Sequence, residues 1–162
     1  MADVKSASLF FLDKEGRWFH EGVEITHKRT ILLFARNLSK GSEGRYYIRV
    51  GKEQAAVEVE DAPFMIRSVT IKENERGLIS GFLLSLNDGT EEYLDPHTLM
   101  ILDDNVMYCS VKSGTERARF LRSAYYQICT QIGPGEKENQ FVLSWMEEKI
   151  PIPPGPNQTK IS

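Results

Sequence analysis

The chain of 162 residues lacks most of the features that reveal a chemistry at first sight. It has two cysteines, too few for a disulfide framework in a chain of this length. No apolar run approaches the ~18 residues of a membrane-spanning helix, and the first residues do not have the pattern of a signal peptide. A net charge of −3 excludes the basic surface of a dedicated nucleic-acid binder. We therefore expect a cytoplasmic protein that binds neither nucleic acid nor membrane.

Catalytic and metal-binding motifs are equally scarce. The sequence has no Gly-x-Ser-x-Gly nucleophile elbow. Cys109 falls in an apolar strand and Cys129 near a helix end, so each is more typical of a core residue than of a nucleophile. The three histidines, His20, His27 and His97, do not have the spacing of metal ligands. We expect no metal and no other cofactor.

The composition is that of a globular protein, 41% hydrophobic and 27% charged. Short apolar segments flanked by turn residues predict strands along most of the chain, and two stretches have helical spacing. The first predicted helix begins at Thr26 and ends before Gly41; the second begins at the capping box Ser113–Glu116 and ends at Ile132. These patterns predict an α+β fold, mostly antiparallel strands with two helices packed on them. Gly-Arg before two aromatics occurs twice, which leaves open two related β-rich motifs that share a core.

The pattern of elements divides the chain into three segments. Residues 1–64 are expected to form a half made of a hairpin, a helix and a second hairpin. Residues 65–132 are expected to form a β-rich half closed by a helix. Residues 133–162 are expected to form a partly disordered tail, because prolines dominate from residue 151 and cannot donate to a sheet ladder.

Three stretches resemble a bacterial family, the domain of unknown function 1285. They are residues 15–22 (Glu-Gly-Arg-Trp-Phe-His-Glu-Gly), 59–64 (Val-Glu-Asp-Ala-Pro-Phe) and 118–126, and the likeness covers about residues 9–132. The chain departs from the family at Glu24-Ile25, where Pro-Ile is expected. The resemblance implies a small cytoplasmic α+β protein built from two related motifs, with a suggested role in signalling and no established catalytic residue. It also implies a set of recurring residues: Trp18, His20, Glu60, Asp61, Pro63, Phe64, Arg122 and Tyr125.

The Val59–Phe64 stretch is the first candidate site. Pro63 restricts its predecessor to extended backbone and ends the strand, so the stretch reads as the joint between the two halves. Glu60 and Asp61 fall at this joint, and we predict that at least one of them pairs with an arginine or accepts backbone amides, which would fix the two halves relative to each other.

A second candidate site lies on the predicted last helix. Arg119, Arg122 and Tyr126 are spaced to share one helix face, away from the apolar stripe. Guanidinium groups near a helix N-terminus favour phosphate or carboxylate groups. The alternative is a solvated face that binds nothing.

The leading hypothesis is a non-enzymatic binding module with a signalling or regulatory role. Its partner would be a small anionic ligand or another protein, and the chain would be a monomer or a homodimer. The alternative is a small hydrolase that uses Glu60, Asp61 and His20, which requires these side chains to converge in one pocket. A third reading is a structural subunit that assembles through sheet edges. The candidate binding residues are Trp18, His20, Glu60, Asp61, Phe64, Arg119, Arg122 and Tyr126.

Overall fold

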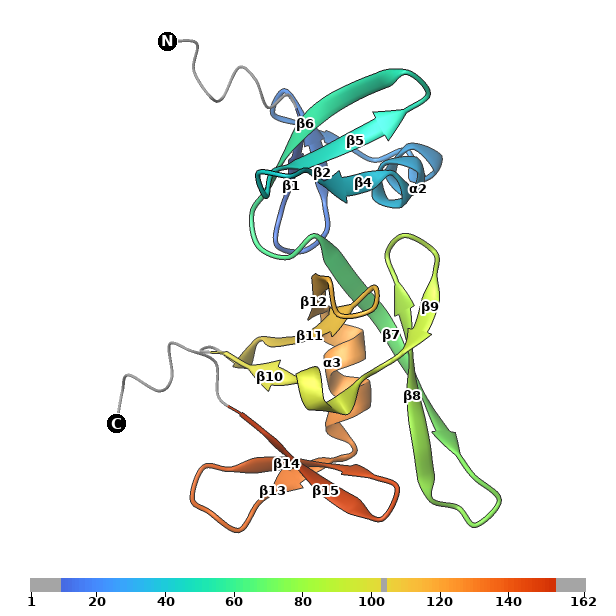
Figure 1. Ribbon diagram of the computed structural model, residues 1–162, viewed down its shortest axis with the longest axis vertical. Helices are drawn as coiled ribbons and strands as arrows, with labels where there is room; N and C mark the ends of the chain where they lie inside the picture. The colour runs from blue at the N-terminus through green and yellow to red at the C-terminus, as the bar shows by residue number, and fades with distance from the viewer. Residues whose placement is uncertain (1–9, 103–104, 154–162) are drawn as a thin grey trace. The chain divides into compact units, whose positions relative to one another are not determined.

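The computed structural model describes residues 10–102 and 105–153 (Figure 1). The chain forms two compact units, each described by itself below. The first unit extends to Phe64 and includes the turn Asn87–Gly89, and the second contains the remaining residues. None of the helices among the described residues has the length and apolarity that crossing a membrane requires.

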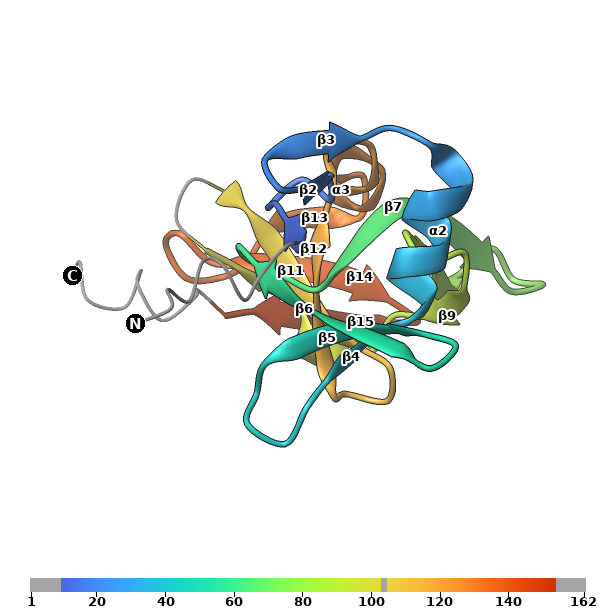
Figure 2. The ribbon, with the colours of Figure 1, turned by 90° about the horizontal axis from the view of Figure 1, so that it is seen from above.

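A six-stranded sheet with one helix makes up the first unit. Its strands follow the spatial order β3-β2-β1-β6-β5-β4. Neighbouring strands are antiparallel except the central pair, β1 and β6, which are parallel. From β3 the chain passes through α2 into β4, as Figure 2 shows from above. The elements are β1 (Phe10–Leu12), β2 (Trp18–His20), β3 (Val23–Ile25), α2 (Lys28–Arg36), β4 (Leu38–Lys40), β5 (Tyr46–Val50) and β6 (Glu53–Val59).

The second unit contains another six-stranded sheet, in the order β10-β11-β12-β7-β8-β9, and a three-stranded sheet, β13-β14-β15. The elements of its large sheet are β7 (Phe64–Glu73), β8 (Ile79–Leu86), β9 (Glu91–Tyr93), the 3-10 helix η1 (Pro96–Thr98), β10 (Met100–Ile101), β11 (Met107–Val111) and β12 (Glu116–Phe120). They are followed by α3 (Arg122–Cys129), β13 (Ile132–Pro134), β14 (Phe141–Trp145) and β15 (Glu148–Ile152).

The two six-stranded sheets have the same topology. In each, three consecutive strands form one side of the sheet, a helical segment follows, and three more strands form the other side. The first and the sixth strand of each series are neighbours at the centre, β1 beside β6 and β12 beside β7. The predicted α+β fold with two related motifs is therefore confirmed, and each motif belongs to its own unit.

The predicted first helix exists but is shorter than its sequence signals suggested. His27, not Thr26, is the N-cap, because its side chain accepts the amide hydrogen of Thr30. The helix ends before Asn37, whose amide donates to carbonyls in the last turn, so the apolar residue Leu38 opens β4 instead of extending the helical stripe.

The predicted second helix is wrong in its first half. Residues 116–120 form β12, which pairs with β11, and only Arg122–Cys129 is helical. Ala118 and Phe120 are buried while Arg117 is exposed, an alternation typical of a strand. The backbone φ angles of Ser113 and Gly114, 58° and 82°, belong to a hairpin turn and not to a helix cap.

The predicted disordered tail needs a correction as well. Pro151 and Ile152 belong to β15, the edge strand of the small sheet, where a missing amide donor is tolerated. Ile152 is buried. The prediction for residues 154–162 lies outside the described residues.

Candidate functional site

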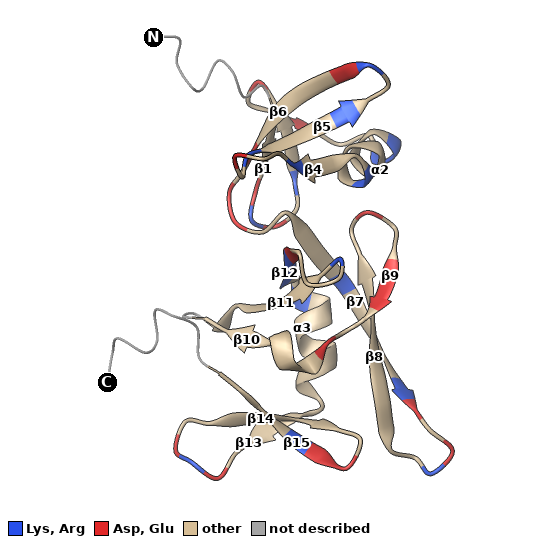
Figure 3. Ribbon diagram, viewed as in Figure 1, with Lys and Arg blue, Asp and Glu red and all other residues tan. Residues whose placement is uncertain are grey.

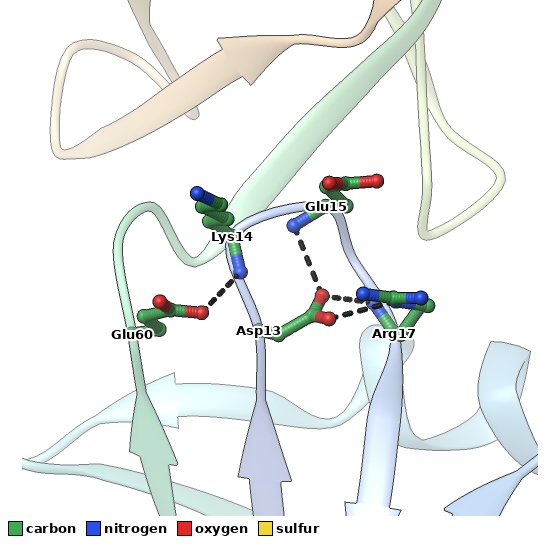
Figure 4. Close-up of polar contacts among 5 residues, drawn as sticks. All are labelled: Asp13, Lys14, Glu15, Arg17 and Glu60. Carbon is green, nitrogen blue, oxygen red and sulfur yellow. Dashed lines mark hydrogen bonds and ion pairs between the residues drawn. The ribbon is translucent and has the colours of Figure 1, made fainter.

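The β1–β2 turn of the first unit is organised by Asp13, which sequence reasoning did not single out. Asp13 is 6% exposed, and its carboxylate accepts the amide hydrogens of Glu15 at 2.9 Å and Arg17 at 2.8 Å. It also pairs with the Arg17 Nε at 2.8 Å (Figure 4). Burial alone would raise the pKa of this carboxyl, but the hydrogen bonds from Arg17 and Glu15 outweigh it and lower the pKa below its usual value. A polar side chain followed three positions later by Gly16 was the sequence signal for this turn.

Glu60 binds to the same turn from the end of β6. Its Oε1 accepts the amide hydrogen of Lys14 at 2.9 Å (Figure 4), as the sequence predicted for at least one of the two acids at the joint. The bond joins two segments of the first unit, so it does not have the predicted role of fixing the two halves relative to each other. Asp61 follows in the connection to β7 and is exposed, whereas Phe64 begins β7 and is buried.

Trp18 and His20 both lie on β2, but their side chains are in different environments. Trp18 is fully buried and its ring meets the ring of Phe34 edge-on at 5.5 Å, which makes it a core residue. His20 is exposed and stacks on the Phe10 ring at 4.5 Å. Its Nε2 lies 3.3 Å from the Glu21 carboxylate.

The strand register keeps His20 away from Glu60. His20 pairs with Phe10, which pairs on its other side with Val57, so these residues share one level of the sheet. Glu60 lies three residues beyond Val57, about 10 Å farther along the strand direction, and two strands across from β2. The hydrolase alternative requires the side chains of His20 and Glu60 to converge, and the register shows that they do not.

The expected shared helix face of Arg119, Arg122 and Tyr126 does not form. Arg119 lies on β12 opposite Tyr108, half-buried, because this segment is a strand. Arg122 is the first residue of α3, and Tyr126 follows one turn later. Tyr126 is 62% exposed and packs edge-on against Tyr125 at 5.8 Å. Only the pair on α3 keeps the predicted spacing.

A cavity lies beside α3 in the second unit. Its volume is about 270 Å³, and its walls are largely apolar, with Ile132 and the half-exposed Phe141 among them. Tyr125 and Cys129 contribute the polar atoms from α3 and form a side-chain hydrogen bond with each other. The spacing of these two residues, one helical turn apart, was visible in the sequence, but the third sheet that completes the walls was not.

Both cysteines are poor nucleophiles. Burial raises the pKa of the Cys129 thiol, although the hydrogen bond from Tyr125 opposes the shift. Burial also raises the pKa of Cys109, which lies inside β11. Since the thiolate is the reactive form, each thiol stays protonated and unreactive at neutral pH. Across residues 10–102 and 105–153, no three His, Cys, Asp or Glu side chains gather closely enough to hold a metal ion.

Two comparisons place this architecture among known proteins. Residues 4–62 match the family model described as "Domain of unknown function (DUF1285), N-terminal domain", which confirms the family resemblance. The crystal structure of a DUF1285 family protein from Silicibacter pomeroyi DSS-3 is similar, with a TM-score of 0.68 and 18% sequence identity over 94% of this chain and 83% of that one.

A second similar crystal structure is that of a DUF1285 family protein from Shewanella baltica OS155. Its TM-score is 0.58 at 24% sequence identity, over 76% of this chain and 91% of that one. No curated protein matches the chain. The comparisons show a similarity to this family of unknown function over residues 4–62 and the fold of the chain, and they assign no ligand or activity.

Proposed function

We propose that the protein is a non-enzymatic binding module that takes a small organic anion with an apolar body into the cavity beside α3. The observation that carries this proposal is that the cavity lies on the same side of α3 as Arg122, whose side chain has no ion-pair or hydrogen-bond partner among the described residues. The resemblance to the bacterial family adds a regulatory or signalling role in the cytoplasm to the proposal.

The cavity suits the apolar part of such a ligand. A volume of about 270 Å³ equals that of roughly nine molecules of liquid water, enough for an organic molecule of modest size. Ile132 and Phe141 offer apolar surface, and the Tyr125 hydroxyl can orient a polar group. Because both cysteine thiols stay protonated, this site is better suited to binding than to covalent chemistry.

Arg122 supplies the charge that an anionic ligand needs. Residues 122, 125 and 129 fall within ~60° of one another around a helix, so Arg122 shares its side of α3 with the two cavity-lining residues Tyr125 and Cys129. Within the part of the chain that the structure describes, Arg122 has no ion-pair or hydrogen-bond partner. The N-cap residue Leu121 offers no side-chain hydrogen bond, so first-turn amides add positive potential beside Arg122.

Binding of octanoate, followed by amide chemical shifts in NMR spectra, tests this function. We expect shifts in α3 and β13, with octanol binding at least about tenfold more weakly because it lacks the charge. Arg122→Gln should weaken octanoate binding about tenfold, and Cys129→Phe should abolish it by filling the cavity.

Arg76→Gln is the matched control, since Arg76 is an exposed arginine in the β7–β8 turn of the same unit. It should bind octanoate as the wild type does. Equal binding of octanol and octanoate, or unchanged binding by Arg122→Gln, would overturn the role of the anion. Absence of shifts with either compound would overturn the proposed function.

A further inference from the structure

The first unit contains a cavity of its own, next to β5 and β6. Its volume is about 250 Å³. Phe10 of β1 and Phe34 of α2 contribute aromatic surface, with ring centroids 5.1 Å apart and planes at 77°. Two rings nearly perpendicular to each other create an aromatic corner at one side of the cavity. Because His20 is stacked on one face of the Phe10 ring, the aromatic surface left for a ligand is that of Phe34 and of the Phe10 face turned away from His20. Electron-rich ring faces attract organic cations.

The strand register places one carboxylate among the apolar residues of the opposite wall. Val50 pairs with Glu53 at the end of the β5–β6 hairpin, so the two side chains share a face of the sheet with Ile48, two positions earlier. All three residues line the cavity, and Glu53 is the one charged side chain among the described residues that line it. Among the described residues, Glu53 has no ion-pair or hydrogen-bond partner.

Among the residues that the structure describes, no lysine or arginine lines the cavity. Arg49 lies on the other face of the hairpin, where its guanidinium donates to Gln54 Oε1 at 3.1 and 2.7 Å. Arg29 and Arg36 lie ~140° or more around α2 from Phe34, so they project from the side of the helix away from the aromatic corner. Figure 3 shows the basic positions of α2 and the mixed charges of the β5–β6 hairpin. The cavity therefore combines an aromatic corner with one unpaired negative charge.

We propose that this cavity binds a small organic ammonium compound, with the ammonium group beside Glu53 and an aromatic or aliphatic body against Phe10 and Phe34. A carboxylate forms a charge-assisted hydrogen bond with an ammonium group, and the ring faces add cation–π attraction. The volume of the cavity equals that of about eight molecules of liquid water, which limits the ligand to a small amine. This site lies in a different unit from the anion site and does not depend on it.

Titration with phenethylammonium, followed by amide NMR shifts in the β5–β6 hairpin, tests the proposal on the full chain. The neutral isostere 2-phenylethanol should bind at least about tenfold more weakly. Glu53→Gln should weaken phenethylammonium binding about tenfold. Glu58→Gln is the matched control, because Glu58 lies on the same strand, is exposed and points to the opposite face.

Two further measurements make the result decisive. Glu53 is exposed, so the unfolding midpoint of Glu53→Gln should equal that of the wild type, and lost binding then reports the missing charge. Cys129→Phe should bind phenethylammonium normally, which separates this site from the cavity beside α3. Equal binding of the alcohol and the amine, or equal binding by Glu53→Gln and Glu58→Gln, would overturn the proposal.

Discussion

The first hairpin turn of each motif follows one plan, although the two turns share little sequence. In the β1–β2 turn, the amide of Asp13 donates to the Arg17 carbonyl at 2.9 Å, and the amide of Gly16 donates to the Asp13 carbonyl at 3.1 Å. The Asp13 side chain then accepts the amides of the third and fifth residues. Gly16 has a φ of 88°, which a residue with a side chain rarely adopts.

The β7–β8 turn repeats each of these bonds. The amide of Asn74 donates to the Leu78 carbonyl at 2.8 Å, and the amide of Gly77 donates to the Asn74 carbonyl at 3.0 Å. Asn74 Oδ1 accepts the amides of Arg76 at 2.9 Å and Leu78 at 3.0 Å. Gly77 has a φ of 79°.

The difference between the turns is their charge. Asp13 is ionised, buried and paired with Arg17, whereas Asn74 is neutral and faces Leu78 at the same position of the turn. Since the backbone bonds are the same, the geometry does not require a charge. The comparison teaches that the charge of Asp13 adds stability and a dependence on pH to a turn that already forms without it.

Truncating the two side chains in separate variants should give the largest difference in stability between the two turns. We expect Asp13→Ala to lower the free energy of unfolding by about 2–3 kcal/mol, because a buried charged acceptor with several donors is lost. Asn74→Ala should cost about 1 kcal/mol, the usual value of neutral hydrogen bonds. Urea unfolding of both variants provides the measurement, and equal losses would show that the charge of Asp13 contributes nothing.

Asp13→Asn should have a smaller effect at neutral pH and a distinct effect in acid. The amide oxygen can still accept the two backbone amides, but the pair with Arg17 is lost, at a cost of about 1 kcal/mol. The folded pKa of Asp13 is lowered, so its contribution is present above the unfolded pKa of about 3.9 and disappears as the pH falls through the folded value. Unfolding midpoints should therefore fall less steeply below about pH 4 in Asp13→Asn than in the wild type.

The reciprocal change, Asn74→Asp, should have the smallest effect. Its carboxylate would accept the same two amides, yet Leu78 gives it no cationic partner at the fifth position, so we expect a change of about 0.5 kcal/mol or less. Thermal unfolding at neutral pH checks this value. If Asn74→Asp gained as much stability as Asp13→Asn loses, the turn amides, and not Arg17, would account for the effect of the charge.

The turns were the most predictable part of the molecule, and the tertiary contacts the least. Gly in the fourth position marks both of these turns in the sequence, and alternation revealed most strands. Residues 116–120 were predicted as helix because their apolar positions fit a helical stripe as well as a strand alternation. Pairing with β11 makes this segment a strand. The Glu21-Gly22 pair has positive φ at both residues and turns the chain from β2 into β3.

The candidate sites were predicted less well than the fold. Arg122 and Tyr126 kept their predicted spacing because both lie on α3, but Arg119 did not. Neither cavity could be located from sequence, since each is lined by segments far apart in the chain. Asp13 was overlooked because a single acidic residue before a turn is common, and only its burial distinguishes it.

The parallel pairing of β1 with β6 has a consequence for synthesis on the ribosome. Phe10 finds its partner only when Val57 has emerged, and closing so long a loop costs entropy before the contact forms. Until then β1 pairs with β2 alone and presents one unpaired edge to other nascent chains. A chain truncated before residue 53 would keep that edge permanently open, so we expect such fragments to aggregate while chains that include β6 do not.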